Sequence, residues 1–390
     1  QNGYLKLNAG NYANIDGALG VNFVNNEANR LNFMFLHNST NGKLNYNQGE
    51  KLEKVKMKNM DNLAKLSFKH LFEASEFDIQ ASFLHSQFNY FGNNFGGESI
   101  DGDNNQQLSV FNFNTSLYNT LPQSINYRGA FSYNYFSTKY GRNLNDDSMG
   151  GSHVEADLDL NKSFIGGDNL VGVKGEFTGV FYDDISTLNE EEEDISNFIM
   201  VDANPYIHLE GFNWKMRLGA NLDFVFDDEN KFYLSPNVAL STLITENTSL
   251  YINAMGGVSK NTYLDMYRES RYLLPNTIVK HSNTPFAIDG GAKIGAIDGF
   301  RIDLFGGYKK TKDEHFLVLN QNVDLGDDPI FGPPNHVQWT FQEFLTPIFG
   351  ELSHSHVGAR VHSNIWSPLD VAVEVKKNFY SVSKIKGLDT

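Results

Sequence analysis

The 390-residue sequence contains no cysteine. A disulfide framework, a thiolate metal site and a cysteine nucleophile are therefore excluded. Basic residues are few as well: 31 Lys and Arg stand against 47 Asp and Glu, and the formal net charge is −16. This balance argues against a nucleic-acid partner, because phosphate groups are neutralised by clustered Lys and Arg.

Long apolar runs are also missing. No run exceeds about four residues, whereas a helix that crosses a bilayer needs roughly twenty. The sequence has no G-x-S-x-G elbow, no H-E-x-x-H motif and no P-loop. We therefore expect neither a membrane-spanning helix nor an enzyme, and no cofactor is indicated.

The pattern that recurs along the chain is period-two alternation. In 153–161 one face is apolar and the other polar, with Val154, Ala156, Leu158 and Leu160 opposite Glu155, Asp157, Asp159 and Asn161. The same division recurs in 125–136, 213–226, 300–304 and 370–376. The longer of these segments suit a tilted strand that crosses a bilayer, which needs about nine to eleven residues. We predict an all-β fold, a transmembrane antiparallel β-barrel of the outer-membrane type; a soluble sandwich or solenoid is the alternative.

The links between the predicted strands distinguish these alternatives. About seventeen strands are expected, and short turns alternate with long links, with one brief exception at 227–230. The long links are 40–60, 92–106, 139–150, 183–196, 260–285 and 320–338. Short turns at one rim and long loops at the other are typical of outer-membrane barrels. Because closure of an antiparallel sheet normally requires an even strand number, we expect residues 1–390 to be one barrel domain that continues in further C-terminal strands, up to 22 in all.

Aromatic residues gather near the ends of the predicted strands. They are Tyr133, Tyr135, Phe136, Phe181, Tyr182, Phe224, Phe226 and Tyr308. Outer-membrane barrels carry girdles of such residues where the barrel meets the membrane interface. We therefore expect these side chains to face lipid.

The segment 234–291 has a more specific order of residues. Leu234-Ser235-Pro236-Asn237-Val238 is followed by Ser249-Leu250-Tyr251-Ile252-Asn253, Gly256-Gly257-Val258, Tyr263, Tyr272, Leu274-Pro275-Asn276-Thr277 and Phe286-Ala287-Ile288-Asp289-Gly290-Gly291. This order resembles the middle of TonB-dependent receptor barrels, above all those of Bacteroidota. Because barrel-like strands begin by Tyr4, we expect the plug and the TonB-contacting segment of that family to lie outside residues 1–390.

The resemblance implies uptake of a bulky nutrient, such as an iron chelate, a vitamin or a glycan, through the outer membrane of a Gram-negative bacterium. It implies outer-membrane lipid and lipopolysaccharide as surroundings, and TonB as a partner if a plug exists in the full protein. A surface lipoprotein or another subunit of an outer-membrane complex is a further candidate partner. The alternatives are a passive porin and a structural or assembly barrel that docks partner proteins.

The predicted lumen face carries charges of both signs. Its residues are Glu155, Asp157, Asp159, Lys215, Arg217, Asp223, Arg301, Asp303 and Glu374. They would line a solvated channel or hold a plug.

Two long loops, 260–285 and 320–338, are the predicted ligand surface. Aromatic and Arg side chains on loops of a rigid scaffold are common contact residues. The candidates are Tyr263, Tyr267, Arg268, Arg271, Tyr272 and Phe331, with Trp339 just beyond the second loop.

Other charged or imidazole groups favour simpler interpretations. His354 and His356 share one face of a predicted strand and could bind a metal, but no third ligand is evident, so no metal is predicted. The acidic loop 183–194 and the lysines of 51–58 are interpreted as solvated loops. Cation bridging to lipopolysaccharide and contact with lipid phosphates are the respective alternatives.

Overall fold

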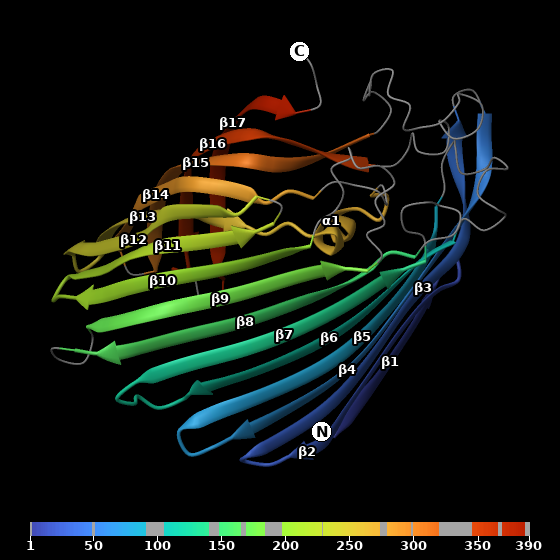
Figure 1. Ribbon diagram of the computed structural model, residues 1–390, viewed down its shortest axis with the longest axis horizontal. Coiled ribbons are helices and arrows are strands. Elements are labelled where there is room, and N and C mark those ends of the chain that lie inside the picture. Colours follow the sequence, from blue (N-terminus) through green and yellow to red (C-terminus); the bar gives the residue numbers. More distant parts are fainter. Residues whose placement is uncertain are drawn as a thin grey trace.

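The computed structural model describes residues 2–48, 51–90, 105–139, 148–164, 169–183, 197–227, 229–273, 279–297, 299–319, 345–365 and 369–386. These residues form seventeen strands in one sheet and one short helix (Figure 1). The first nine strands are β1 Gly3–Gly10, β2 Asn14–Asn25, β3 Asn29–Gln48, β4 Lys51–Leu71, β5 Ser75–Asn89, β6 Asn105–Asn119, β7 Asn126–Thr138, β8 Gly150–Ser163 and β9 Leu170–Tyr182. The remaining elements are β10 Phe198–Glu210, β11 Trp214–Phe226, β12 Lys231–Thr245, β13 Thr248–Ser259, α1 Tyr263–Glu269, β14 Ser282–Ile297, β15 Phe300–Leu319, β16 Leu345–Ser363 and β17 Val371–Lys386.

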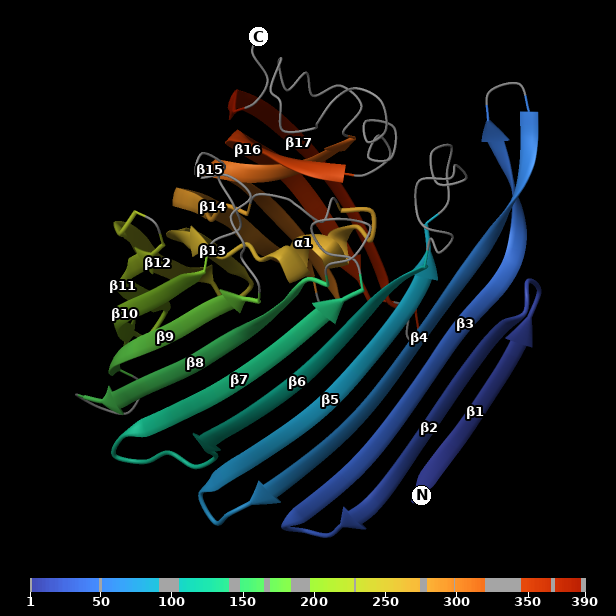
Figure 2. The ribbon, with the colours of Figure 1, turned by 45° about the vertical axis from the view of Figure 1, so that its right-hand side comes forward.

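Each strand pairs antiparallel with the next one along the chain, from β1–β2 to β16–β17. The sheet curls around an interior that contains α1, as the two views in Figures 1 and 2 agree. In the described part of the chain, β1 and β17 form the two edges of the sheet and do not pair with each other. The all-β antiparallel fold and the predicted number of strands are confirmed.

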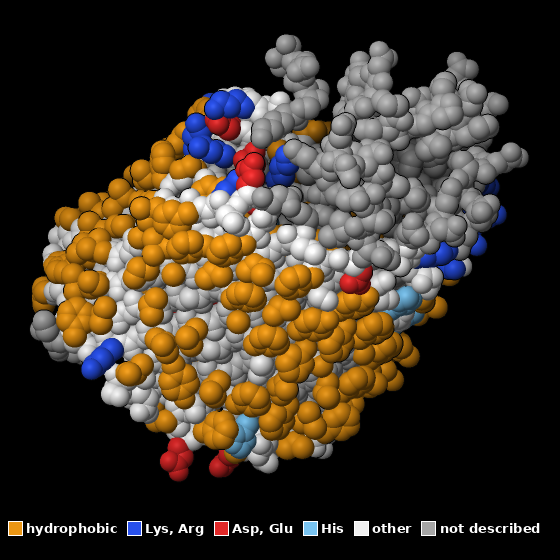
Figure 3. Space-filling model, in the orientation of Figure 1, with side chains coloured by type: hydrophobic (Ala, Val, Ile, Leu, Met, Phe, Trp, Pro, Cys, Tyr) orange, Lys and Arg blue, Asp and Glu red, His pale blue; other side chains and the backbone are white. Residues whose placement is uncertain are grey.

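The alternation of side chains gives the sheet an apolar outer face. On β8 and β9, Leu158 and Val173 are exposed on the side away from α1, whereas His153 and Val180 are buried beneath the helix. Figure 3 shows hydrophobic side chains spread over the outer surface of the strands that face the viewer. Such a face is expected where a barrel contacts lipid. In the described residues, no helix is long and apolar enough to cross a membrane.

The predicted long link at 40–60 is wrong. Strands β3 and β4 continue through it as one ladder, in which Thr40 pairs with Asn59 and Gln48 pairs with Lys51. The ladder satisfies the backbone hydrogen-bonding groups, so the hairpin extends as paired strands. Residues 51–58 are therefore part of β4 and not a loop.

Most of the aromatic residues predicted to face lipid lie on the outer face, but two of them do not. Tyr135, Phe181 and Phe224 are exposed on the outer face. Phe136 and Tyr182, however, are buried on the inner face, against the segment that contains α1. Neighbouring residues of a strand point to opposite faces, so an aromatic residue near a strand end is not necessarily part of a lipid-facing girdle.

Candidate functional site

The link between β13 and β14 turns into the interior of the barrel. We refer to the described residues of this link, 260–273 and 279–281, as the inward segment. It contains α1, which Figures 1 and 2 both show inside the curve of the sheet. The segment brings together five of the residues predicted as ligand contacts: Tyr263, Tyr267, Arg268, Arg271 and Tyr272.

Helix α1 is short and well capped. The Thr262 hydroxyl accepts a hydrogen bond from the Asp265 N–H at 3.1 Å and donates one to the Asp265 carboxylate at 2.7 Å. Thr at this position satisfies an N–H group that would otherwise lack a partner at the helix start. An acidic residue in the first turn and Arg268 in the last turn also suit the helix dipole.

One face of α1 is buried against the inner wall. Tyr263, Leu264, Met266 and Tyr267 are all at most 2% exposed. Their spacing, i, i+1, i+3 and i+4, places them on one side of the helix. They join a hydrophobic cluster with inner-face residues of several strands, among them Phe88, Val110, Phe136, Val180 and Phe198. The helix is thus held by burial of its apolar face.

Aromatic contacts orient the helix within this cluster. The rings of Tyr263 and Phe136 stack with centroids 6.0 Å apart and planes at 18°. The hydroxyl of Tyr182 accepts a hydrogen bond from the Tyr263 N–H at 3.1 Å. The rings of Tyr90 and Tyr272 pack edge to face with their centroids 5.5 Å apart. The inward segment is therefore packed against the wall at both ends of α1.

Lys260 anchors the start of the inward segment. Its Nζ lies 2.6 Å from Glu155 Oε1, 3.6 Å from Glu176 Oε1 and 3.4 Å from Thr178 Oγ1. Burial disfavours the charged form of Lys260. The hydrogen bond to Glu155 and the negative charges of Glu155 and Glu176 have the larger effect, and they raise the pKa of the ammonium group. Lys260 therefore remains charged and bridges the segment to β8 and β9.

Arg271 anchors the segment on the far side of α1. Its Nη1 donates to Asn59 Oδ1 at 2.6 Å, and its Nη2 lies 3.3 Å from both carboxylate oxygens of Asp61. The guanidinium also lies over the ring of Phe88, 5.3 Å from its centroid. The Ser86 hydroxyl and, at 3.4 Å, the Asn59 amide also donate to Asp61, so three residues share this carboxylate.

The return to β14 is buried too. The ring of His281 meets Phe198 edge to face at 4.2 Å. Burial lowers the pKa of His281 below its usual value. Glu269, the last residue of α1, contacts His315 Nε2 on β15 at 3.1 Å. The segment therefore contacts β4, β8, β9, β10 and β15, and spans much of the interior.

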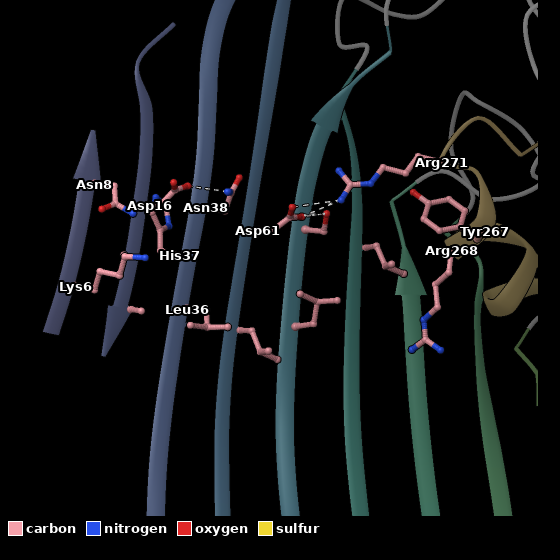
Figure 4. Close-up of a pocket in the computed structure, with 16 residues that line it drawn as sticks. Lys6, Asn8, Asp16, Leu36, His37, Asn38, Asp61, Tyr267, Arg268 and Arg271 are labelled. Carbon is pink, nitrogen blue, oxygen red and sulfur yellow. Dashed lines mark hydrogen bonds and ion pairs between the residues drawn. The ribbon is translucent and has the colours of Figure 1, made fainter. Parts of the chain in front are cut away.

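A cavity of about 610 Å³ opens between α1 and the inner faces of β1–β6 (Figure 4). Its polar lining includes Lys6, Asp16, Asp61, Tyr267, Arg268 and Arg271. Leu36, Leu63, Leu84 and Leu108 supply an apolar floor. The volume and the mixture of apolar and polar groups fall in the usual range of small-molecule sites.

A second recess of about 900 Å³ lies along the inner faces of β10–β17 and is lined by charges. Five of the nine predicted lumen residues line it: Lys215, Arg217, Arg301, Asp303 and Glu374. Most are already paired within the wall. Lys215 contacts Glu210 at 2.6 Å, Arg301 contacts Asp303 at 2.9 Å, and the Nε of Arg360 donates to Glu374 at 2.8 Å.

The other four predicted lumen residues also lie on the inner face. Glu155 pairs with Lys260, and Asp157 lies 3.9 Å from Lys174. Asp159 accepts a hydrogen bond from the Tyr206 hydroxyl at 2.9 Å, and Asp223 accepts one from the Val258 N–H at 3.0 Å. These carboxylates contribute to contacts inside the wall and not only to a solvated channel surface.

The predicted ligand residues differ in how accessible they are. Tyr263 is fully buried, so its side chain is not open to a ligand in this conformation. Arg268 and Arg271 line the cavity, and so does the buried Tyr267. Tyr272 packs against Tyr90. Phe331 and Trp339 lie outside the described residues, as do residues 184–194 of the acidic loop 183–194.

The histidines considered as metal ligands have other contacts. The ring of His354 stacks on that of Tyr380 with centroids 4.6 Å apart, and its Nε2 forms a hydrogen bond with Asn378 Oδ1 at 3.1 Å. His356 lies 3.5 Å from Asp289. Within the described ranges, no three His, Cys, Asp or Glu residues are grouped as a metal site would require.

Sequence reasoning missed several residues that hold this site together. Lys260, Asp61 and Phe88 were not singled out, although each contacts the inward segment or its anchors. The T-x-x-D pattern at Thr262 and Asp265 is a recognisable helix start and could have indicated α1. The strand partners of the two anchors come from distant strands and have no local signal.

Comparison with solved structures shows the fold to be that of known outer-membrane proteins. The siderophore receptor PirA from Pseudomonas aeruginosa aligns with 97% of this chain and 66% of its own, at 12% identity and a TM-score of 0.65. The copper transporter OprC aligns with 97% and 61%, at 11% identity and a TM-score of 0.62. The ferric-catecholate import receptor Fiu from K12 E. coli aligns with 98% and 66%, at 10% identity and a TM-score of 0.61.

The chain thus spans about 61–66% of the length of these three structures. No protein-family model and no curated protein matches the sequence. The structural neighbours are TonB-dependent outer-membrane receptors and transporters. The fold of this chain is therefore that of a transmembrane antiparallel β-barrel of the outer-membrane type.

Proposed function

We propose that this chain forms the barrel of a TonB-dependent transporter in the outer membrane of a Gram-negative bacterium, and that it imports a bulky nutrient. The observation that carries the proposal is the shared fold with PirA, OprC and Fiu over nearly the whole chain. The apolar outer face provides the lipid contact that this location requires. The residue order of 234–291 supports the Bacteroidota type of such barrels.

The inward segment favours controlled import over a passive porin. It is held to the inner wall by Lys260, Arg271 and the buried face of α1. A segment anchored in this way narrows the lumen and leaves less room for free diffusion. Coupling to TonB and a plug domain elsewhere in the protein are part of the proposal, as is docking of a surface lipoprotein at the outer rim.

Uptake in cells tests the transport proposal. A strain that lacks the gene for this chain would be compared with a complemented strain for accumulation of radiolabelled iron chelates, copper, cobalamin and oligosaccharides. We expect one class to depend on the gene, and its uptake to stop when TonB is deleted or a protonophore is added. If uptake of no class depends on the gene, or if the dependent uptake continues without TonB, the proposal is wrong.

Planar bilayer recordings separate the transporter from a porin. The purified barrel with its inward segment intact should give small or no steady conductance. Large, stable, ohmic channels in the wild-type protein would instead favour a passive porin.

A further inference from the structure

The hydroxyl of Tyr267 is an unpaired polar group at the wall of the cavity beside α1. Tyr267 is 2% exposed, and within the described structure its hydroxyl has no hydrogen-bond partner. Figure 4 shows this hydroxyl directed from α1 toward the strands that form the rest of the cavity. Burial raises the pKa of Tyr267, so the group stays protonated and is available as a donor. A buried donor without an acceptor is costly, and an acceptor on a ligand would remove that cost.

Positive charge exceeds negative charge around the same cavity. Three cationic side chains line it, Lys6, Arg268 and Arg271, against two carboxylates, Asp16 and Asp61. Asp61 is engaged by Arg271. Arg268 extends into the cavity in Figure 4 and contacts only the half-exposed Asp265, at 3.6 Å, among the described residues. Exposed pairs of this kind are weak, so Arg268 is free to bind another anion.

The remaining lining is apolar. Leu36, Leu63, Leu84 and Leu108 come from four successive strands, β3 to β6. Leu36, Leu63 and Leu84 are aligned across their strands by the pairing register, since Leu36 pairs with Leu63 and Leu63 with Leu84. Together they form a flat surface suited to an aromatic or aliphatic group.

We propose that this cavity binds an organic anion with an apolar body. Its acidic group pairs with Arg268 while the body rests on the leucines, and the Tyr267 hydroxyl donates to the ligand from another side of the cavity. This inference rests on the proposed transport function and specifies the substrate class for it. It favours an anionic organic molecule over a bare metal cation. Contact with α1 would also place the ligand directly against the inward segment.

Isothermal titration calorimetry on the complete purified barrel tests this site with two soluble probes. Naphthalene-2-sulfonate supplies an anion on an apolar body, and naphthalen-2-ylmethylammonium supplies a cation of similar shape. We expect the sulfonate to bind and the ammonium compound to bind at least about tenfold more weakly. The site is refuted if the sulfonate gives no binding heat, or if both probes bind equally.

Point variants locate the binding. We expect Arg268→Gln to weaken sulfonate binding about tenfold or more, because it loses a hydrogen bond to a charged group, and Tyr267→Phe to weaken it by a smaller factor. Arg268→Lys, which keeps the charge, should retain more affinity than Arg268→Gln. Arg128→Gln is the control, since Arg128 lies at the opposite end of β7 from Thr138, the residue paired with Leu108. Unchanged affinity in both Arg268→Gln and Tyr267→Phe would mean that the sulfonate binds elsewhere, and would overturn the proposal.

The proposed binding site and the proposed transport function can be refuted independently of each other. If the sulfonate binds as expected but no nutrient uptake depends on the gene, the transport function is wrong and the site stands. If uptake depends on the gene but the probe does not bind, the transport function stands and the site is wrong.

Discussion

The guanidinium of Arg271 lies 3.3 Å from both carboxylate oxygens of Asp61, although the two residues are 210 positions apart in the chain. Asp61 belongs to the inner face of β4, whereas Arg271 follows α1 in the inward segment. The contact thus joins the link between β13 and β14 to the opposite part of the barrel wall. Together with Lys260 it determines where the segment lies.

Loss of the Arg271 contact should release the inward segment. In hydrogen–deuterium exchange, we expect Arg271→Gln to lower the opening free energy of 260–273 by about 1 kcal/mol, because both side chains are partly exposed. Asp61→Asn should have a similar effect, and the double variant should lose less than the sum of the two. Strictly additive effects would show that the two residues do not interact. Arg128→Gln serves as the control for loss of an inner-face arginine.

Removal of the Lys260 ammonium should loosen the other end of the segment. Lys260→Met leaves Glu155 and Glu176 without this cation, and we expect a loss of about 1 kcal/mol in the opening free energy at neutral pH. The pKa of Lys260 is raised in the folded protein. Its contribution should therefore be complete below pH ~10.4, the unfolded value, and should fall as the pH rises through the folded pKa. A Lys260→Met protein with the same exchange rates as wild type would contradict this.

The ring of Tyr263 should matter more than its hydroxyl. Tyr263→Ala removes a fully buried ring that stacks on Phe136, and we expect a loss of about 3–5 kcal/mol in local stability. Tyr263→Phe keeps the ring, and the hydroxyl has no hydrogen-bond partner in the described structure. This variant should be at least as stable as wild type. Urea titration monitored by exchange of the segment compares them; equal losses in both variants would mean that the hydroxyl has a partner.

Acid should weaken the packing at His281. Burial lowers the pKa of the His281 imidazole in the folded segment, whereas the pKa in the unfolded state is near 6.5. At pH values between these two pKa values, the open state of the segment binds more protons than the closed state. Stability of the segment is therefore present above about pH 6.5 and decreases as the pH falls below it. Asp227 and Lys231, the charges that act on His281, have opposing effects. After correction for intrinsic exchange, opening of 279–281 should increase from pH 7.5 to pH 5.5 in wild type and not in His281→Phe.

The barrel could be predicted from the sequence because the alternation of apolar and polar residues that produces each strand is visible within a short segment. In β8, Leu158 and Asp159 alternate between an apolar outer face and a polar inner face, and this period is visible in one segment. Strand number and antiparallel order follow from repetition of the same pattern. The long link predicted at 40–60 is a pair of strands, because a long polar segment can form either a loop or a pair of extended strands.

The site was harder to predict because its contacts are not local. Helix α1 is only seven residues long, too short for helical periodicity to stand out. Arg271 and Tyr267 could be chosen from their residue types, but their positions depend on how the segment enters the barrel. Phe136 and Tyr182 are buried by that same entry, which no pattern within β7 or β9 reveals.

The position of the inward segment can be measured most directly by cysteine labelling, since the natural chain has no cysteine. Leu264, on the buried face of α1, is 1% exposed, whereas Phe212 in the turn between β10 and β11 is fully exposed. In the purified barrel, we expect Phe212→Cys to react rapidly with a maleimide and Leu264→Cys to react at least about a hundredfold more slowly. Adding Arg271→Gln should accelerate the labelling of Leu264→Cys and leave that of Phe212→Cys unchanged. Labelling of both cysteines at the same rate would show that the segment does not lie packed inside the barrel and would contradict the account.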